Sequence, residues 1–112
     1  MAEFRDAASE ARAYESAVFS KDRGNWPDLR FPVTKLGPVF QTTWCHGATG
    51  IGLGRAASVH GSVSEAERVD VEQAMATTIH AGLDPLDHLC CGNLGRVEAL
   101  LVAGEKFGHC RS

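Results

Sequence analysis

The sequence predicts an all-α protein built from helical hairpins, and three observations support that prediction. Apolar residues recur at helical spacing in several stretches of the 112-residue chain. No stretch shows a convincing strand pattern. A six-residue motif occurs twice, at residues 45–50 and 90–95, and this 45-residue period suits a helical hairpin repeat.

The first half of the chain predicts a helix, a long loop and a second helix. Apolar residues at helical spacing place the first helix at residues 4–19. Several glycines and prolines mark residues 20–43 as a long loop, and loops of that length are often functional. Residues 47–50 then predict a tight turn, followed by a short helix from Ile51 that ends near Gly61.

The second half of the chain predicts two more helices. Ser64 and Glu67 have the spacing of a capping box, which satisfies free backbone N–H groups at a helix start, and the helix that follows reaches Gly82. Pro85 prevents this helix from continuing through residues 84–91. A last amphipathic helix covers residues 94–101 and stops at Gly104.

Composition and charge limit what the chain can be. With 44% hydrophobic and 22% charged residues, it fits one globular unit or a piece of a larger one. The formal net charge is −3 and neither sign collects in a run, so nothing indicates a nucleic-acid partner. No signal peptide or transmembrane segment is apparent, so a cytoplasmic location is expected. Four cysteines in that setting favour a metal or redox role over disulfides.

The repeated motif has the pattern C-[H/C]-G-x-x-G and places cysteines at the start of two helices. It occurs as Cys45-His46-Gly47-Ala48-Thr49-Gly50 and as Cys90-Cys91-Gly92-Asn93-Leu94-Gly95. Each copy leads into an apolar helical segment, so stacked hairpins would bring the distant cysteines together. A nearby helix N-terminus favours thiolate over thiol, because its free N–H groups and dipole stabilise negative charge.

Cys45, Cys90 and Cys91 are the candidate ligands of one zinc ion, Zn²⁺. Zinc prefers sulfur and nitrogen ligands, and catalytic sites typically use three protein ligands and leave the fourth position to water or substrate. A substrate thiol in that position would lose its proton and become a nucleophile at neutral pH. The alternative is a closed structural site, whose fourth ligand would be His46, His88 or Cys110.

Residues beside these ligands also have expected roles. His46 is the candidate catalytic residue, as a proton donor or through a hydrogen bond to the site. Trp44 is expected to pack beneath the metal loop, and Trp26, in the segment 25–28, to anchor the long loop.

The segments 44–53 and 89–95, read as WCHGATGIGL and LCCGNLG, resemble the cyclase domain of class II lanthipeptide synthetases. These are the LanM enzymes, which are related to the LanC cyclases. The segment 25–30, NWPDLR, is similar to the one that precedes the first motif in LanM proteins, and the resemblance covers most of residues 14–101. It implies part of an α/α toroid of helical hairpins. Residues 1–112 are then a partial LanC-like cyclase domain that carries the zinc site.

The resemblance also implies ligands and a reaction. The zinc ligands would be Cys45, Cys90 and Cys91, the last in place of the histidine of the stand-alone cyclases. A cysteine of a lanthipeptide precursor, bound to zinc as thiolate, would add to a dehydroalanine or dehydrobutyrine of the same peptide. Protonation of the resulting enolate leaves a lanthionine or methyllanthionine. The expected partners are this precursor peptide and the remainder of the synthetase.

Two other functions remain open from the sequence alone. One is a peptide-binding module in which the zinc is structural and has four protein ligands. The other keeps thiol addition but uses glutathione, which some LanC-like proteins attach to dehydroamino acids in damaged proteins.

Overall fold

Four α-helices make up most of the described chain, in a computed structural model that covers residues 1–59 and 61–108. They are α1 (Ala2–Val18), α2 (Ala48–Ala57), α3 (Glu65–Ala81) and α4 (Asn93–Ala103), and a π-helical turn, η1 (Gly104–Gly108), follows α4. These ranges contain no strand, only isolated β-bridges within residues 20–47. The prediction of an all-α protein is therefore confirmed.

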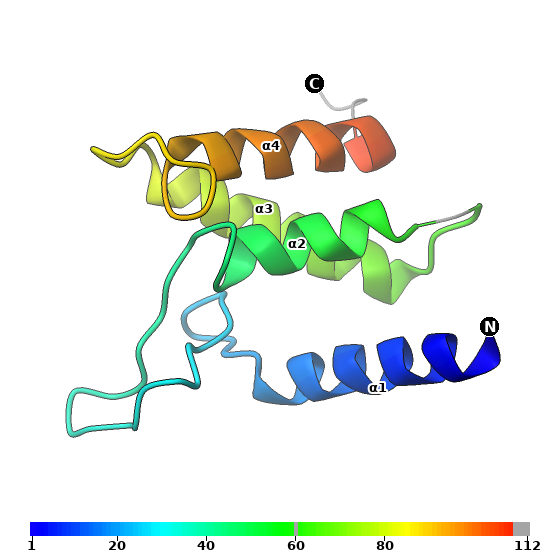
Figure 1. The fold of residues 1–112 in the computed structure, drawn as a ribbon, viewed down its shortest axis with the longest axis horizontal. Helices are drawn as coiled ribbons and strands as arrows, with labels where there is room; N and C mark the ends of the chain where they lie inside the picture. The colour runs from blue at the N-terminus through cyan, green and yellow to red at the C-terminus, as the bar shows by residue number, and fades with distance from the viewer. Residues whose placement is uncertain (60, 109–112) are drawn as a thin grey trace.

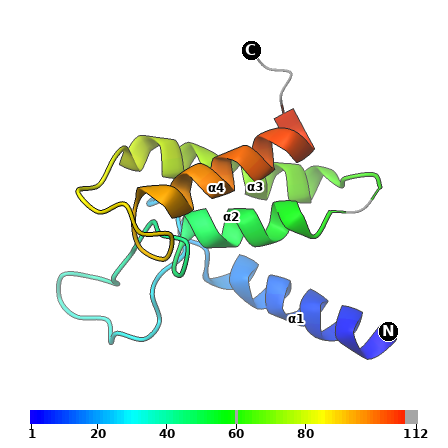
Figure 2. The same ribbon diagram turned by 45° about the horizontal axis from the view of Figure 1, so that its top comes forward.

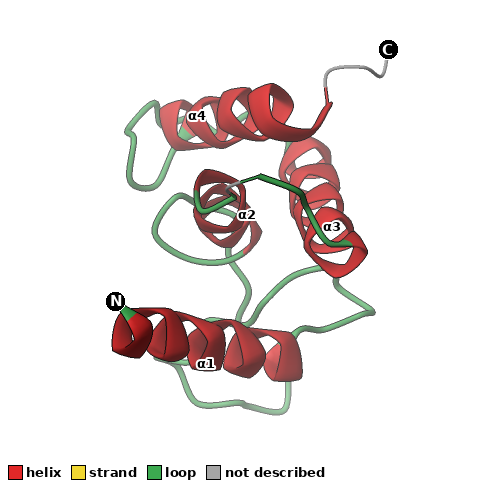
Figure 3. Ribbon diagram, turned by 90° about the vertical axis from the view of Figure 1, so that its right-hand side faces the viewer, coloured by secondary structure: helices red, strands yellow, loops and turns green. Residues whose placement is uncertain are grey.

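Successive helices run antiparallel, and α2, α3 and α4 pack against one another. α2 and α4 run in one direction, and α1 and α3 run in the other (Figure 1). α2 is the central helix, with α3, α4 and α1 on different sides of it (Figure 3). The loops that precede α2 and α4 consequently lie at the same end of the molecule, which the turned view also shows (Figure 2).

Small side chains let α2 and α4 approach their neighbours closely. The buried stripes have four-residue spacing: Ala48, Gly52 and Ala56 on α2, and Gly95, Ala99 and Ala103 on α4. A Cβ on Gly52 would lie only 2.7 Å from the Cβ of Ala74 and 2.6 Å from the Cε of Met75, both on α3. Only glycine at this position permits the observed separation of α2 and α3.

Arg55 on α2 connects three helices from the interior. Its side chain is 6% exposed, its Nη1 donates a hydrogen bond to Asp70 of α3 at 2.5 Å, and its Nη2 donates to Glu15 of α1 at 3.0 Å. α1 itself buries no residue. A ring contact between Phe19, which follows α1, and Trp26 adds a second attachment, with centroids 4.7 Å apart. α1 is thus held by these contacts and by Val18, which is partly buried and packs against the core.

The predicted helices and long loop agree with the structure within a few residues, and the predicted capping box of Ser64 and Glu67 is present. One detail was wrong. Residues 47–50 are not a tight turn: Gly47 has φ 89°, but α2 already begins at Ala48, whose N–H donates to Asn25 Oδ1 at 2.8 Å. α4 ends at Ala103 with Gly104 as its C-cap, as predicted, and the π-helical turn η1 follows.

The first glycine of the repeated motif packs in the same way in both copies. A Cβ on Gly47 would collide with the carbonyl oxygen of Gln41, and one on Gly92 with the carbonyl oxygen of Leu86. Gln41 and Leu86 are 45 positions apart, as the two glycines are. The same backbone approach therefore recurs in both loops.

The second glycine of the motif shows the same equivalence. Gly50 lies against the carbonyl oxygen of Trp44, and Gly95 against that of Leu89, which are again 45 positions apart. The repeat is thus structural as well as sequential. In each loop, two glycines allow the backbone to fold tightly around the cysteine position.

Gly95→Ala is expected to destabilise the chain by roughly 1–3 kcal/mol, the usual range for overpacking. The added methyl group would meet the Leu89 carbonyl oxygen and lie 2.7 Å from the Cβ of Trp44. Gly54→Ala is the matched control, because a Cβ at this other helical glycine meets no atom within 4 Å. Gly54→Ala should raise the free energy of unfolding by about 0.5–1 kcal/mol. Urea denaturation measures both, and equal stability of the two variants would refute this account of the loop.

Candidate metal centre

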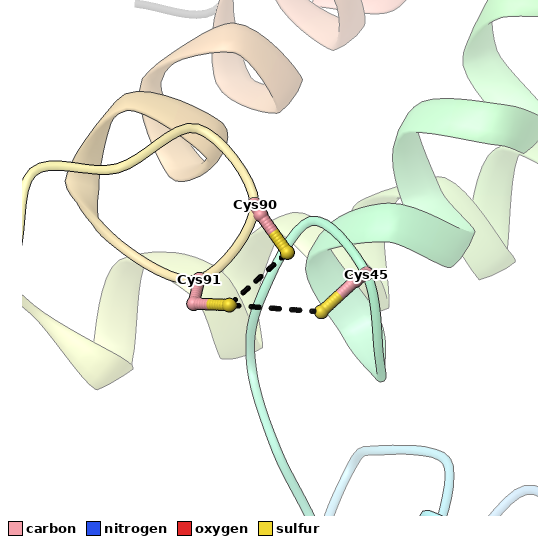
Figure 4. Close-up of side chains that lie close together, drawn as sticks. All are labelled: Cys45, Cys90 and Cys91. Carbon is pink, nitrogen blue, oxygen red and sulfur yellow. Dashed lines mark hydrogen bonds between the residues drawn. The ribbon is translucent and has the colours of Figure 1, made fainter.

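Three cysteine side chains from two loops meet at one end of the helices. Cys45 precedes α2, Cys90 and Cys91 precede α4, and their Sγ atoms point toward one another (Figure 4). The Cys45 Sγ lies 4.0 Å from the Cys91 Sγ, which lies 3.1 Å from the Cys90 Sγ. All three sulfurs are within 4.8 Å of one another. The structure thus brings together the three ligands that the sequence predicted.

This donor set fits a zinc ion. Sulfur ligands at a tetrahedral zinc lie about 3.8 Å apart, given Zn–S bonds of about 2.3 Å. The Cys45–Cys91 separation of 4.0 Å is close to that value, and the Cys90–Cys91 separation of 3.1 Å is shorter. The three thiols are free and exposed, so ions can reach them. No other cluster of potential metal ligands of this kind occurs within residues 1–59 and 61–108.

Hydrogen bonds between the two loops hold the cysteines together. The backbone N–H of Cys45 donates to the carbonyl oxygen of Cys90 at 3.2 Å. Arg96 of α4 donates from Nε to the Thr42 carbonyl oxygen at 3.0 Å and from Nη1 to the Gly82 carbonyl oxygen at 2.7 Å. One arginine therefore ties α4 and its preceding loop to the loop that carries Cys45.

One asparagine fixes each cysteine loop. Asn25 Nδ2 donates to the Gln41 carbonyl oxygen at 3.1 Å, while its Oδ1 accepts from Ala48 N at 2.8 Å. Asn93 Nδ2 donates to the Asp84 carbonyl oxygen at 2.7 Å, and its Oδ1 accepts from Asp84 N at 2.7 Å. Neither role followed from the sequence. Asn93 lies inside the motif at the start of a helix, and Asn25 begins the segment 25–30, but neither place names a hydrogen-bond partner.

The pKa values of Cys45 and Cys90 are shifted in opposite directions. Hydrogen bonding with Thr43, and secondarily with His46, lowers the pKa of Cys45 to about 6. Hydrogen bonding with Cys91, and then with Cys45, raises the pKa of Cys90 to about 12. Like charges at this separation disfavour a second thiolate, whereas a bound cation removes that penalty. The cluster is therefore suited to a divalent ion.

His46 stands beside the sulfurs and faces two clefts. Its Nδ1 lies 3.3 Å from the Cys45 Sγ. The first cleft, of about 430 Å³, lies between α1 and α2, and its wall includes Cys45, His46 and Trp44. The second, of about 560 Å³, is bounded by α1 and the long loop, and its wall includes Cys45, His46 and Arg30. Cys45 is accordingly reachable from either cleft.

The other residues singled out by the sequence do not join the cluster. His88 lies on the second loop but outside the group of sulfurs, and Cys110 lies outside the described residues. The expectation for Trp44 was wrong: it is 42% exposed and lines the first cleft. Its carbonyl oxygen packs against Gly50 and its Cβ against Gly95. Trp26, 3% exposed, anchors the long loop as expected.

Comparison with known proteins agrees with the helical hairpins and the cysteine cluster. The family model described as lanthionine synthetase C-like protein matches residues 2–111. Searches of curated proteins and of solved structures found no match. Within the described residues, no helix has the length and apolar character needed to cross a membrane. Because the family model spans nearly the whole chain, the chain belongs to the lanthionine synthetase C-like family.

Proposed function

We propose that residues 1–112 are the zinc-binding part of a lanthionine cyclase domain of the class II, LanM type. Its substrate is a lanthipeptide precursor, in which it closes thioether rings. Family membership supports a cyclase-related function. The observation that carries the proposal is the convergence of Cys45 and Cys90, which occupy equivalent positions of a structural repeat, with Cys91, which occupies the position of His46. A cysteine at position 91, where stand-alone cyclases have histidine, supports the class II assignment.

The three cysteines would hold zinc as thiolates, one from the first loop and two from the second. When bound, zinc would lower the pKa of a peptide thiol in the open position, so that the thiol reacts as thiolate at neutral pH. The cysteine loops are exposed at the end of the helices, which leaves space for an incoming peptide.

The addition conserves all atoms of the peptide and requires no oxidant. The cysteine sulfur bonds to the β-carbon of a dehydroalanine or dehydrobutyrine, the carbon–carbon π bond breaks, and the α-carbon takes up a proton. His46 is the proposed donor of that proton. Its ring lies 3.3 Å from the Cys45 Sγ and lines both clefts beside the cluster, so it can reach a residue bound in either one.

The two clefts support a peptide as substrate. Both are lined by Ala11, Cys45, His46 and Ile51, so two clefts border Cys45. A ring-forming peptide must present its thiol and its dehydro residue at one place while its chain extends in two directions. Clefts of about 430 and 560 Å³ are within the usual range for ligand sites.

Zinc content tests the metal proposal. The full chain should retain one equivalent of zinc after dialysis, whereas Cys45→Ala and Cys91→Ala should lose most of it, because two sulfurs hold zinc far less tightly than three. His88→Ala is the matched control, since His88 is exposed on the same loop as Cys91 but outside the cluster. Undiminished zinc in Cys45→Ala would rule out the proposed ligand set.

Cobalt substitution separates an open site from a closed one. In a three-cysteine site, adding a small thiol such as 2-mercaptoethanol should strengthen the sulfur-to-cobalt charge-transfer absorption, because the thiol takes the open position. Cys110→Ser should leave that response unchanged. If added thiol leaves the charge-transfer absorption unchanged, and this absorption weakens in Cys110→Ser, the site is a closed structural one. That result would contradict the cyclase proposal.

His46→Gln should keep its zinc but slow thiol addition by roughly 100-fold or more, because the proton donor is lost. The assay uses a peptide with one cysteine and one dehydroalanine. Since ring closure does not change the peptide mass, it is followed by loss of the free thiol that iodoacetamide labels. His88→Gln serves as the control. An unchanged rate in His46→Gln would assign the proton transfer to another group.

A further inference from the structure

Arg30 is a fixed cation in the wall of the second cleft. The proposed cyclisation mechanism gives it no role. Asp28 holds it through two parallel hydrogen bonds, from Nε to Oδ1 at 3.0 Å and from Nη2 to Oδ2 at 2.7 Å. The backbone N–H of Arg30 also donates to Asp28 Oδ1, at 3.1 Å. Such a bidentate pair fixes the plane of the guanidinium as well as its position.

The residue that holds Arg30 is itself anchored next to the cysteine loop. The Asp28 side chain is 1% exposed, its Oδ2 accepts a hydrogen bond from Gln41 Nε2 at 2.6 Å, and its backbone N–H donates to the Val39 carbonyl oxygen at 2.7 Å. Gln41 is four residues before Cys45, and its carbonyl oxygen packs against Gly47. Arg30 is therefore positioned relative to Cys45 through a short series of contacts.

Both members of the pair are charged at neutral pH. The hydrogen bond from Arg30 holds the pKa of Asp28 well below its usual range. The hydrogen bond with Asp28 raises the pKa of Arg30, and the charges of Cys45 and Cys91 act in the same direction. The guanidinium thus lies within electrostatic reach of the sulfur cluster.

One edge of the guanidinium remains open to the cleft. Within residues 1–59 and 61–108, Nη1 has no hydrogen-bond partner, and the Arg30 side chain is 57% exposed. Tyr14, Cys45 and His46 line the same cleft. If Arg30 served only to neutralise the buried Asp28 carboxylate, its side chain would not need to border the cleft beside the reactive sulfurs.

We propose that Arg30 binds a negatively charged oxygen of the substrate, close to the carbon that the thiolate attacks. This inference rests on the proposed function and deepens it. The oxygen has two possible sources: a carboxylate that the peptide already carries, or the acceptor's carbonyl oxygen. The latter becomes negative when sulfur adds to the double bond and the π electrons move into the enolate. An arginine with a free N–H edge suits either source.

Three small reagents test this on the metal-free chain, with Cys45 itself as the nucleophile. Iodoacetamide and iodoacetate both form a carbon–sulfur bond and release iodide, but only iodoacetate carries a carboxylate. Acrylamide is neutral and adds through its double bond, so an oxyanion forms during the reaction and a water proton completes the product. All three attack the same thiolate, so ratios of their rates cancel any change in the amount of that thiolate. Trypsin releases residues 36–55, which contain only Cys45.

Arg30→Gln should lower one of two rate ratios by roughly threefold or more, a modest effect because the site is partly exposed to solvent. A fall in the iodoacetate-to-iodoacetamide ratio supports a substrate carboxylate, and a fall in the acrylamide-to-iodoacetamide ratio supports the developing oxyanion. Arg5→Gln is the matched control, because it removes the same charge from α1 but borders neither cleft. Unchanged ratios in Arg30→Gln would overturn the proposal.

A second variant covers the case in which Arg30→Gln fails to fold. Removing Arg30 alone leaves the buried Asp28 carboxylate without its main partner, whereas the double variant Asp28→Asn with Arg30→Gln removes both charges. The double variant should fold, as judged by circular dichroism, and show the same fall in one of the two rate ratios. If both rate ratios of the folded double variant equal those of the wild type, the proposal is equally overturned. None of these measurements involves zinc, so failure here is distinguishable from failure of the metal proposal.

Discussion

The candidate site depends on the contact between two loops that precede parallel helices. A backbone hydrogen bond joins Cys45 to Cys90, and Arg96 reaches from α4 to the carbonyl oxygen of Thr42. These bonds bring together cysteines that are 45 positions apart in the chain. Each loop is stiff for its own reason, because a buried or partly buried asparagine satisfies its backbone groups. The candidate metal ligands are thereby arranged by protein contacts, which reduces the ordering that binding of a metal ion would have to produce.

The scaffold beneath these loops has an unusually small-residue core. The fully buried side chains are mainly alanines, together with Val71, Thr49 and Thr78. The two threonines bond to each other at 2.9 Å between α2 and α3. Such a core supplies limited hydrophobic stabilisation per residue but permits close helix contacts, which keep the ends of α2 and α4 in register. α1 stands outside this core, and the space that it leaves beside α2 becomes the first cleft.

Much of the helical fold and the cysteine cluster followed from local sequence patterns. Apolar periodicity located the helices, the spacing of Ser64 and Glu67 located a capping box, and the repeat identified the cysteines that the structure brings together. The supporting residues could not be found in this way. Arg96 acts across 54 positions and Asn25 across 23, and a pattern within one segment carries no information about such distant partners. The Trp44 prediction failed because the exposure of a side chain depends on its neighbours in space, which the local sequence does not give.

The four motif glycines have a consequence for how related sequences are interpreted. They contact backbone carbonyl groups at equivalent places, and none of those contacts involves a sulfur atom. The shape of each loop is therefore encoded separately from the candidate metal ligands. A relative in which serine or alanine replaced the cysteines could preserve the same loop conformation, with its glycines under unaltered selection. Retention of the glycine pattern indicates a shared architecture. Only the cysteines themselves indicate metal binding.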